Sequence, residues 1–184
     1  VLATVAPGQD PLKVKDADRR AIVYNTAPAG TLRPAVLILH GGQGGAEQMR
    51  LTSGFDPLAK SEGFIAVYPE GTDFGQGRHA WNTGHLLRRQ VRDADDLAYF
   101  DALIERLIRE HGADPKRIFM TGGSNGGMMT HVYAIRRASR LAAAAPVVGA
   151  LFPGEPFPQA PLPVLMISGA LDEEVPLEGG MSRN

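Results

Sequence analysis

The chain has 184 residues, of which 43% are hydrophobic and 21% are charged, values typical of one globular domain and not of a disordered or fibrous chain. Nineteen Lys and Arg against twenty Asp and Glu give a net charge of −1, so the sequence lacks the basic surplus expected of a nucleic-acid partner. The absence of cysteine excludes disulfides, thiolate metal ligands and a cysteine nucleophile. The longest apolar stretch, residues 141–152, is interrupted by Pro146 and is shorter than the roughly 20 residues that span a bilayer.

The beginning of the chain predicts a lead-in segment followed by the edge of a sheet. Residues 1–12 contain Pro and Gly without a hydrophobic period, so we expect the folded domain to occupy residues 13–184. Residues 13–15 and 19–25 favour β-structure on either side of a short Asp-rich connection, which predicts a hairpin of two edge strands.

The middle of the chain predicts alternating strands and helices. The apolar runs 35–39 (AVLIL) and 64–68 (FIAVY) predict two buried strands. The mixed segment 46–60 between them predicts a helix that breaks or restarts at Pro57. Residues 93–111 have apolar side chains at helical spacing, acids in the first turn and a glycine after the last residue, and therefore predict a helix.

The last part of the chain continues this alternation. Residues 117–121, 143–148 and 163–168 predict strands, and residues 125–137 predict a helix after the first of them. Strands that alternate with helices predict an α/β fold with a largely parallel sheet covered on both faces.

The sequence Gly122-Gly123-Ser124-Asn125-Gly126 lies directly between a predicted strand and a predicted helix. A G-x-S-x-G motif in this context is typical of a nucleophile elbow, in which a sharp turn exposes the serine hydroxyl and the flanking glycines allow strand and helix to approach closely. The backbone N–H of Asn125 would lie at a helix N-terminus, where it can stabilise an oxyanion. The alternatives are a structural glycine turn or a phosphate-binding loop, although no Lys follows as a P-loop requires.

A second glycine-rich loop, residues 40–45 (HGGQGG), follows the first central strand. A loop at this place supplies the other oxyanion donor in hydrolases of this architecture, and we predict the N–H of Gly42 as that donor. A dinucleotide-binding loop is the alternative, but the third glycine of its fingerprint would fall on Glu47. His40, at the strand end, is interpreted as a structural histidine or as a residue of the substrate site.

Asp172 follows the predicted strand 163–168 and comes after Ser124 in the chain, the order expected for the acid of a Ser-acid-His triad. Its carboxylate would orient the catalytic imidazole. The alternative is an acidic surface loop, because Glu173 and Glu174 follow it directly.

These motifs resemble the polyhydroxybutyrate depolymerase and feruloyl esterase family of secreted α/β-hydrolases. The likeness extends from about residue 13 to residue 180 and includes LHGG (39–42), GFIAVYPEG (63–71), WNTG (81–84), DADDLAYFDALIERL (93–107), DPKRIFMTGGSNGGMM (114–129), APVVGAL (145–151) and PVLMISGALDEEVPLEGG (163–180). The resemblance implies a serine esterase with Ser124 as nucleophile, Asp172 as acid, Gly42 and Asn125 as oxyanion donors, and Trp81 near the substrate.

The resemblance also implies the substrate class. We expect hydrolysis of feruloyl or acetyl esters of plant polysaccharide, or of a short-chain hydroxyalkanoate polyester, by a secreted enzyme. No cofactor, metal, nucleic acid or membrane partner is expected, and the sequence does not indicate an oligomeric state.

The catalytic histidine is not where the family places it, which is after one further strand beyond Asp172. All five histidines, at positions 40, 79, 85, 111 and 131, precede Asp172. We therefore expect the sequence to be a fragment that lacks the C-terminal strand and helix of the fold, with the base beyond Asn184. The alternatives are that His79 or His85 reaches the cleft, or that the protein is a catalytically silent binding module.

Overall fold

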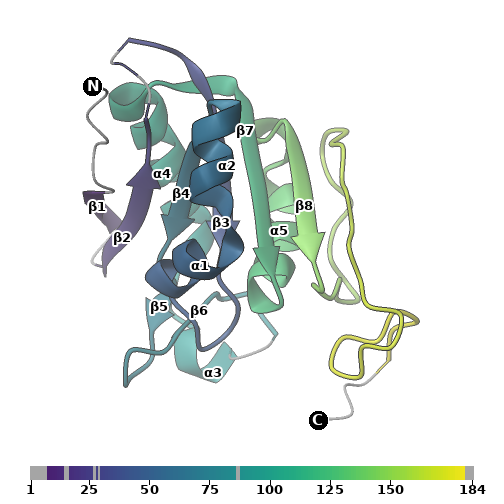
Figure 1. The fold of residues 1–184 in the computed structure, drawn as a ribbon. Helices are drawn as coiled ribbons and strands as arrows, with labels where there is room; N and C mark the ends of the chain where they lie inside the picture. Colours follow the sequence, from purple (N-terminus) through teal and green to yellow (C-terminus); the bar gives the residue numbers. More distant parts are fainter. Residues whose placement is uncertain (1–7, 15–16, 27, 29, 86–87, 181–184) are drawn as a thin grey trace.

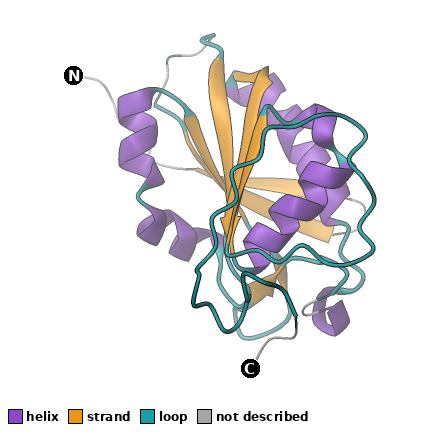
Figure 2. Cartoon of the chain, turned by 90° about the vertical axis from the view of Figure 1, so that its right-hand side faces the viewer, coloured by secondary structure: helices purple, strands orange, loops and turns teal. Residues whose placement is uncertain are grey.

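The computed structural model describes residues 8–14, 17–26, 28, 30–85 and 88–180. It forms a central sheet of six strands in the order β1-β2-β4-β3-β7-β8, with helices on both faces (Figures 1 and 2). The strands from β4 to β8 run parallel, and β1 and β2 form an antiparallel edge. The predicted α/β class and the mainly parallel sheet are therefore confirmed.

The bounds of the strands and helices in chain order are β1 Gly8–Val14, β2 Ala17–Tyr24, β3 Arg33–Leu39, α1 Ala46–Ser53, α2 Phe55–Glu62, β4 Ile65–Pro69, β5 Thr72–Asp73, β6 His79–Ala80, α3 Arg88–Val91, α4 Asp96–His111, β7 Ala113–Gly123, α5 Asn125–Arg136 and β8 Ala143–Val147. The sequence pattern did not reveal α3 or the small hairpin of β5 and β6, because elements this short show no hydrophobic period.

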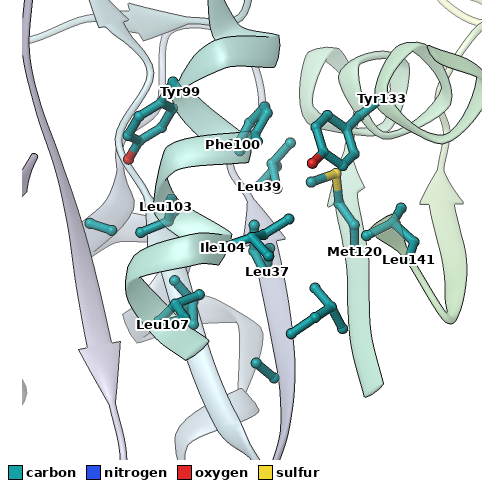
Figure 3. Close-up of a cluster of buried hydrophobic side chains, with 14 of the residues drawn as sticks. Leu37, Leu39, Tyr99, Phe100, Leu103, Ile104, Leu107, Met120, Tyr133 and Leu141 are labelled. Carbon is teal, nitrogen blue, oxygen red and sulfur yellow. The ribbon is translucent and has the colours of Figure 1, made fainter. Parts of the chain in front are cut away.

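Strand β3 lies near the middle of the sheet, and its side chains are buried on both faces. Leu37 and Leu39 contact the larger hydrophobic cluster beneath α4 and α5, whereas Ile38 contacts the smaller one beneath α1 and α2. Figure 3 shows the larger cluster, in which Phe100 and Ile104 of α4 lie beside Leu39 and Leu37 of β3. Such two-sided burial explains the unbroken apolar run in the sequence.

Two predicted boundaries differ from the structure for local reasons. Strand β1 begins at Gly8, within the segment that we expected to be a lead-in. The helix between β3 and β4 is interrupted at Gly54, whose φ of 74° is left-handed, and not at Pro57. Proline is tolerated in the first turn of a helix, where its missing N–H would have no intrahelical partner.

The predicted strand 163–168 is not formed as a strand. Its only ladder contacts among the described residues are two parallel bridges to β8, Ala144 with Val164 and Val147 with Ile167. Leu165 and Met166 are 63% and 65% exposed, so this apolar segment has a partner on one side only. A strand needs a continuous ladder, and the apolar pattern alone does not supply it.

None of the helices within the described ranges has the length and apolar character needed to cross a bilayer.

Candidate active site

Ser124 occupies a sharp turn between the end of β7 and the start of α5. Its φ of 54° and ψ of −121° lie in a region that residues other than glycine rarely adopt, and such strain is concentrated at functional sites. The residue is exposed, and its backbone N–H donates to the carbonyl oxygen of Val147 at 3.0 Å. Among the described residues, no partner hydrogen-bonds its hydroxyl, so this group is available to an external molecule.

The glycines on either side of Ser124 are required by close packing. A β-carbon on Gly122 would lie 2.7 Å from the carbonyl group of Gly126 and from the side chain of Leu39. A β-carbon on Gly126 would lie 2.5 Å from the carbonyl oxygen of His40. The steric role predicted for both glycines is confirmed, and the turn is held directly against the end of β3.

The glycine-rich loop after β3 lies beside the serine. A β-carbon built on Gly41 would be 3.6 Å from the β-carbon of Ser124, and the predicted donor Gly42 is the next residue in the chain. Asn125 is the first residue of α5, so its N–H has no partner within the helix. The structure thus brings the segments of both predicted oxyanion donors to Ser124.

A cavity of about 400 Å³ lies between this loop and α1. It is lined by His40, Gly41, Gly42, Gln43, Gly44, Gln48, Met49 and Thr52. The glutamines and the threonine offer hydrogen bonds without net charge, and Met49 offers an apolar contact. This lining suits a neutral group that carries hydroxyl or carbonyl oxygens.

His40 is buried at the edge of this cavity and is held by backbone groups. Its ring is 1% exposed. The N–H of Gly71 donates to Nε2 at 2.9 Å, so the ring proton resides on Nδ1, which lies 2.7 Å from the carbonyl oxygen of Gly41. Burial lowers the pKa of His40 below 6.5, which keeps the ring neutral. These contacts support the structural interpretation of His40.

Trp81, which we expect near the substrate, is buried beside Asn125 and the glycine-rich loop. Its side chain is fully buried and packs against the rings of His40 and Phe100, at centroid distances of 4.9 and 5.2 Å. The indole N–H donates to the carbonyl oxygen of His40 at 2.9 Å. The main chain of Trp81 pairs with the side chain of Asn125, through N–H to Oδ1 at 2.8 Å and Nδ2–H to the carbonyl oxygen at 3.2 Å.

Asp172 lies after the segment that bridges to β8 and is only partly exposed. Its Oδ1 accepts hydrogen bonds from the N–H groups of Glu174 at 2.9 Å and Val175 at 2.8 Å, whereas Oδ2 has no partner among the described residues. Because β7, β8 and this segment run parallel, Ser124 and Asp172 follow the same edge of the sheet. One oxygen is fixed and the other is free to accept from an imidazole.

The structure does not pair any of the five histidines, all of which are described, with the hydroxyl of Ser124. His79 Nδ1 lies 3.2 Å from the carbonyl oxygen of Gly44. His85 stacks on Phe152 at a centroid distance of 3.9 Å. These contacts therefore do not support the hypothesis that His79 or His85 reaches Ser124.

Asp95 and Asp96, at the start of α4, have structural roles. Asp95 caps the helix by accepting from the N–H of Ala98 at 3.0 Å. Asp96 forms a 2.8 Å ion pair with Arg19, and the two side chains are 1% and 7% exposed. The described residues contain no cluster of His, Asp or Glu suited to a metal ion.

Glu70 is a site-supporting residue that sequence reasoning missed. Its Oε1 accepts from the N–H of Ala46 at 2.7 Å, and its Oε2 accepts from Arg20 at 3.2 Å. The carboxylate therefore anchors the point where the glycine-rich loop enters α1. The residue lies within the matched GFIAVYPEG motif, but that motif indicated no role for it.

The chain is similar in sequence to several known proteins. A family model described as esterase PHB depolymerase matches residues 21–175. The bifunctional acetylxylan esterase/xylanase XynS20E of Neocallimastix patriciarum is 29% identical over 157 residues, which are 85% of this chain and 22% of that protein. Feruloyl esterase B of Piromyces equi is 31% identical over 155 residues, 82% of this chain and 28% of that protein.

The fold is also found among solved structures. The crystal structure of a thermostable esterase superimposes on this chain with a TM-score of 0.74 at 19% identity. The match covers 94% of this chain and 48% of the esterase chain. The chain thus spans less than half the length of each of these proteins.

Proposed function

Because the chain belongs to the esterase PHB depolymerase family and has the α/β-hydrolase fold, we propose that it hydrolyses carboxylic esters through an acyl-enzyme on Ser124. The observation that carries this proposal is the exposed, left-handed Ser124 at the strand-to-helix turn. A nucleophile in that position reaches a carbonyl carbon while the backbone N–H groups of two neighbouring segments receive the developing negative charge.

The proposed reaction follows from the arrangement of these groups. Ser124 Oγ attacks the ester carbonyl as a histidine removes its proton, and the N–H groups of Gly42 and Asn125 stabilise the oxyanion. Each such donor is worth about 3 to 4 kcal/mol of transition-state stabilisation. The histidine then protonates the leaving alcohol and activates water for deacylation. Asp172 would orient the histidine through its free Oδ2.

We propose that this histidine lies beyond Asn184, as the chain order of the family implies. Two observations support the proposal. His40 is held neutral between two backbone groups, and His79 and His85 contact other partners. The Oδ1 of Asp172 is fixed by two N–H groups, as an orienting carboxylate needs to be.

The substrate class is proposed from the relatives and the cavity. Acetyl and feruloyl esters of plant polysaccharide agree with the names of the two relatives, and a hydroxyalkanoate polyester agrees with the family description. The uncharged polar lining beside the glycine-rich loop suits any of these neutral esters. Secretion remains a prediction from the resemblance.

The test is an assay of the full-length protein and its Ser124→Ala variant with p-nitrophenyl acetate and methyl ferulate. We expect the variant to lose about six orders of magnitude in kcat. Ser61→Ala is the matched control, because Ser61 lies on the exposed surface of α2 and bonds only to local groups. Equal activity in wild type and Ser124→Ala would refute the proposal. A folded but inactive wild type would favour the catalytically silent binding module.

A further inference from the structure

We propose that the segment 79–81 is a clamp that fixes the distance between the two oxyanion-donor segments, with Trp81 as its central positioning residue. This inference rests on the proposed esterase function and assigns a specific role to a buried residue that does not touch substrate. The segment is hydrogen-bonded to Asn125 on one side and to the glycine-rich loop on the other.

The first side of the clamp holds the start of α5. The side-chain amide of Asn125 both accepts from and donates to the main chain of Trp81, at 2.8 and 3.2 Å. Asn125 is 2% exposed, so water does not compete for these bonds. A reciprocal amide pair of this kind fixes the side chain and, through it, the position of the backbone N–H of Asn125.

The second side of the clamp holds the glycine-rich loop at two places. Before the glycines, the indole N–H of Trp81 donates to the carbonyl oxygen of His40 at 2.9 Å. After Gly41 and Gly42, the N–H of Gln43 donates to the backbone carbonyl oxygen of His79 at 2.8 Å. The N–H of His79 in turn donates to the carbonyl oxygen of Gly44 at 3.2 Å. Gly41 and Gly42 lie between these anchors.

The anchors matter because glycine has an unusually wide choice of backbone conformations. Two successive glycines cannot by themselves hold an N–H group in one direction, whereas an oxyanion donor is effective only when it is already aimed at the developing charge. Hydrogen bonds on both sides of the Gly41-Gly42 pair remove that freedom. The clamp therefore supplies the rigidity that the glycines lack.

Burial makes the indole bond effective. Trp81 has no exposed surface and packs between His40 and Phe100. In such surroundings a hydrogen bond is stronger than in water, and its loss would leave the carbonyl oxygen of His40 without its indole donor. The same residue thus contacts one donor segment through its side chain and the other through its main chain.

The test uses Trp81→Phe, which keeps an aromatic ring but removes the indole N–H, in the full-length protein. Rates are expressed per active site titrated with a phosphonate, so that loss of folded protein does not count. We expect kcat to fall about 10- to 100-fold with KM changed less than about threefold. Affinity for a trifluoromethyl ketone, which forms a tetrahedral adduct on the serine, should fall by the same factor as kcat/KM.

The control is Ile104→Val, which disturbs the same hydrophobic cluster at a buried residue that is not part of the clamp. It should lower the Tm but leave kcat per titrated site and ketone affinity unchanged. Asn125→Ala, which breaks the other side of the clamp and retains the backbone N–H, should lower kcat as Trp81→Phe does. It provides a second test if Trp81→Phe does not fold.

Two outcomes would overturn the clamp. One is unchanged kcat and ketone affinity in Trp81→Phe, or in Asn125→Ala where only that variant folds. The other is an equal loss in Ile104→Val, which would indicate a general packing effect. Failure of the esterase proposal is distinguishable, because either Ser124→Ala would then retain activity or the folded wild type would have none.

Discussion

Gly126 lies directly against the carbonyl oxygen of His40, so close that a β-carbon on Gly126 would be 2.5 Å from that oxygen. The contact joins the start of α5 to the end of β3 and brings the turn at Ser124 beside the glycine-rich loop. Two backbone segments at this distance cannot separate without moving the elements that carry them.

Gly126→Ala should therefore destabilise the protein. Helix propensity alone favours Ala over Gly by about 1 kcal/mol in α5, whereas the steric clash with backbone atoms should cost about 1 to 3 kcal/mol and decide the sign. Gly123→Ala is the matched control in the same turn, because a β-carbon there meets no atom within 4 Å. Urea denaturation of both variants checks this, and a Gly126→Ala protein as stable as wild type would contradict it.

Asp96→Asn should destabilise the protein by about 3 to 5 kcal/mol, because it leaves the buried guanidinium of Arg19 without its counter-charge. The two groups are 2.8 Å apart, and both are almost fully buried. Glu110→Gln removes a surface ion pair of the same length to Arg106 and should leave the denaturation midpoint unchanged. Equal effects of the two substitutions would show that burial of the Arg19 pair has no energetic consequence.

Stability should fall as the pH is lowered from about 6.5, the ordinary histidine value. Burial lowers the pKa of both His40 and His131 in the folded state. Below pH 6.5 the unfolded chain therefore binds protons that the folded chain does not, and each histidine removes at most about 1.4 kcal/mol per pH unit until its folded pKa is reached. Above pH 6.5 the histidines of the unfolded chain are neutral as well, so His40 and His131 no longer lower the stability.

An NMR titration of the ring nitrogens checks the pH dependence at its source. His40 should remain neutral well below pH 6.5, with the proton on Nδ1 and Nε2 unprotonated, because Nε2 accepts from the N–H of Gly71. A ring that becomes doubly protonated at or above pH 6.5 would contradict both the burial argument and the assigned tautomer.

Asp172→Asn should lower kcat by about four orders of magnitude, the loss known for removing the orienting charge of a serine triad. The turn should survive, because an amide oxygen can still accept from the N–H groups of Glu174 and Val175. Glu173→Gln is the control, since this neighbouring acid has no role in the proposed reaction. Steady-state kinetics of the full-length variants decide this, and a fall of less than tenfold in Asp172→Asn would remove Asp172 from the mechanism.

The parts of the site that the sequence predicted are those with a local signal. The turn at Ser124 combines an apolar strand, two glycines and a helix start within a few residues, and the structure places β7 and α5 at these positions. The steric need for Gly122 could be predicted for the same reason, because its contact with Gly126 lies within a single turn. The contact of Gly126 with His40 joins residues that are distant in the sequence.

The parts that could not be predicted depend on residues distant in the sequence. Trp81 and Asn125 are 44 positions apart, and no local pattern indicates that the indole is buried or that it contacts His40. The segment 163–168 has the composition of a strand, but it has a ladder partner on one side only. Composition indicates a tendency to form a strand, whereas neighbouring strands determine whether it forms.

The most direct test of the central claim is covalent labelling of the full-length protein with a fluorophosphonate, followed by mass spectrometry of its peptides. We predict one label per chain, on Ser124, with ester hydrolysis lost in proportion to labelling and no label on the Ser124→Ala variant. Hydrolysis that persists when Ser124 is fully labelled, or a label on another residue that alone abolishes activity, would contradict the claim that Ser124 carries the acyl group.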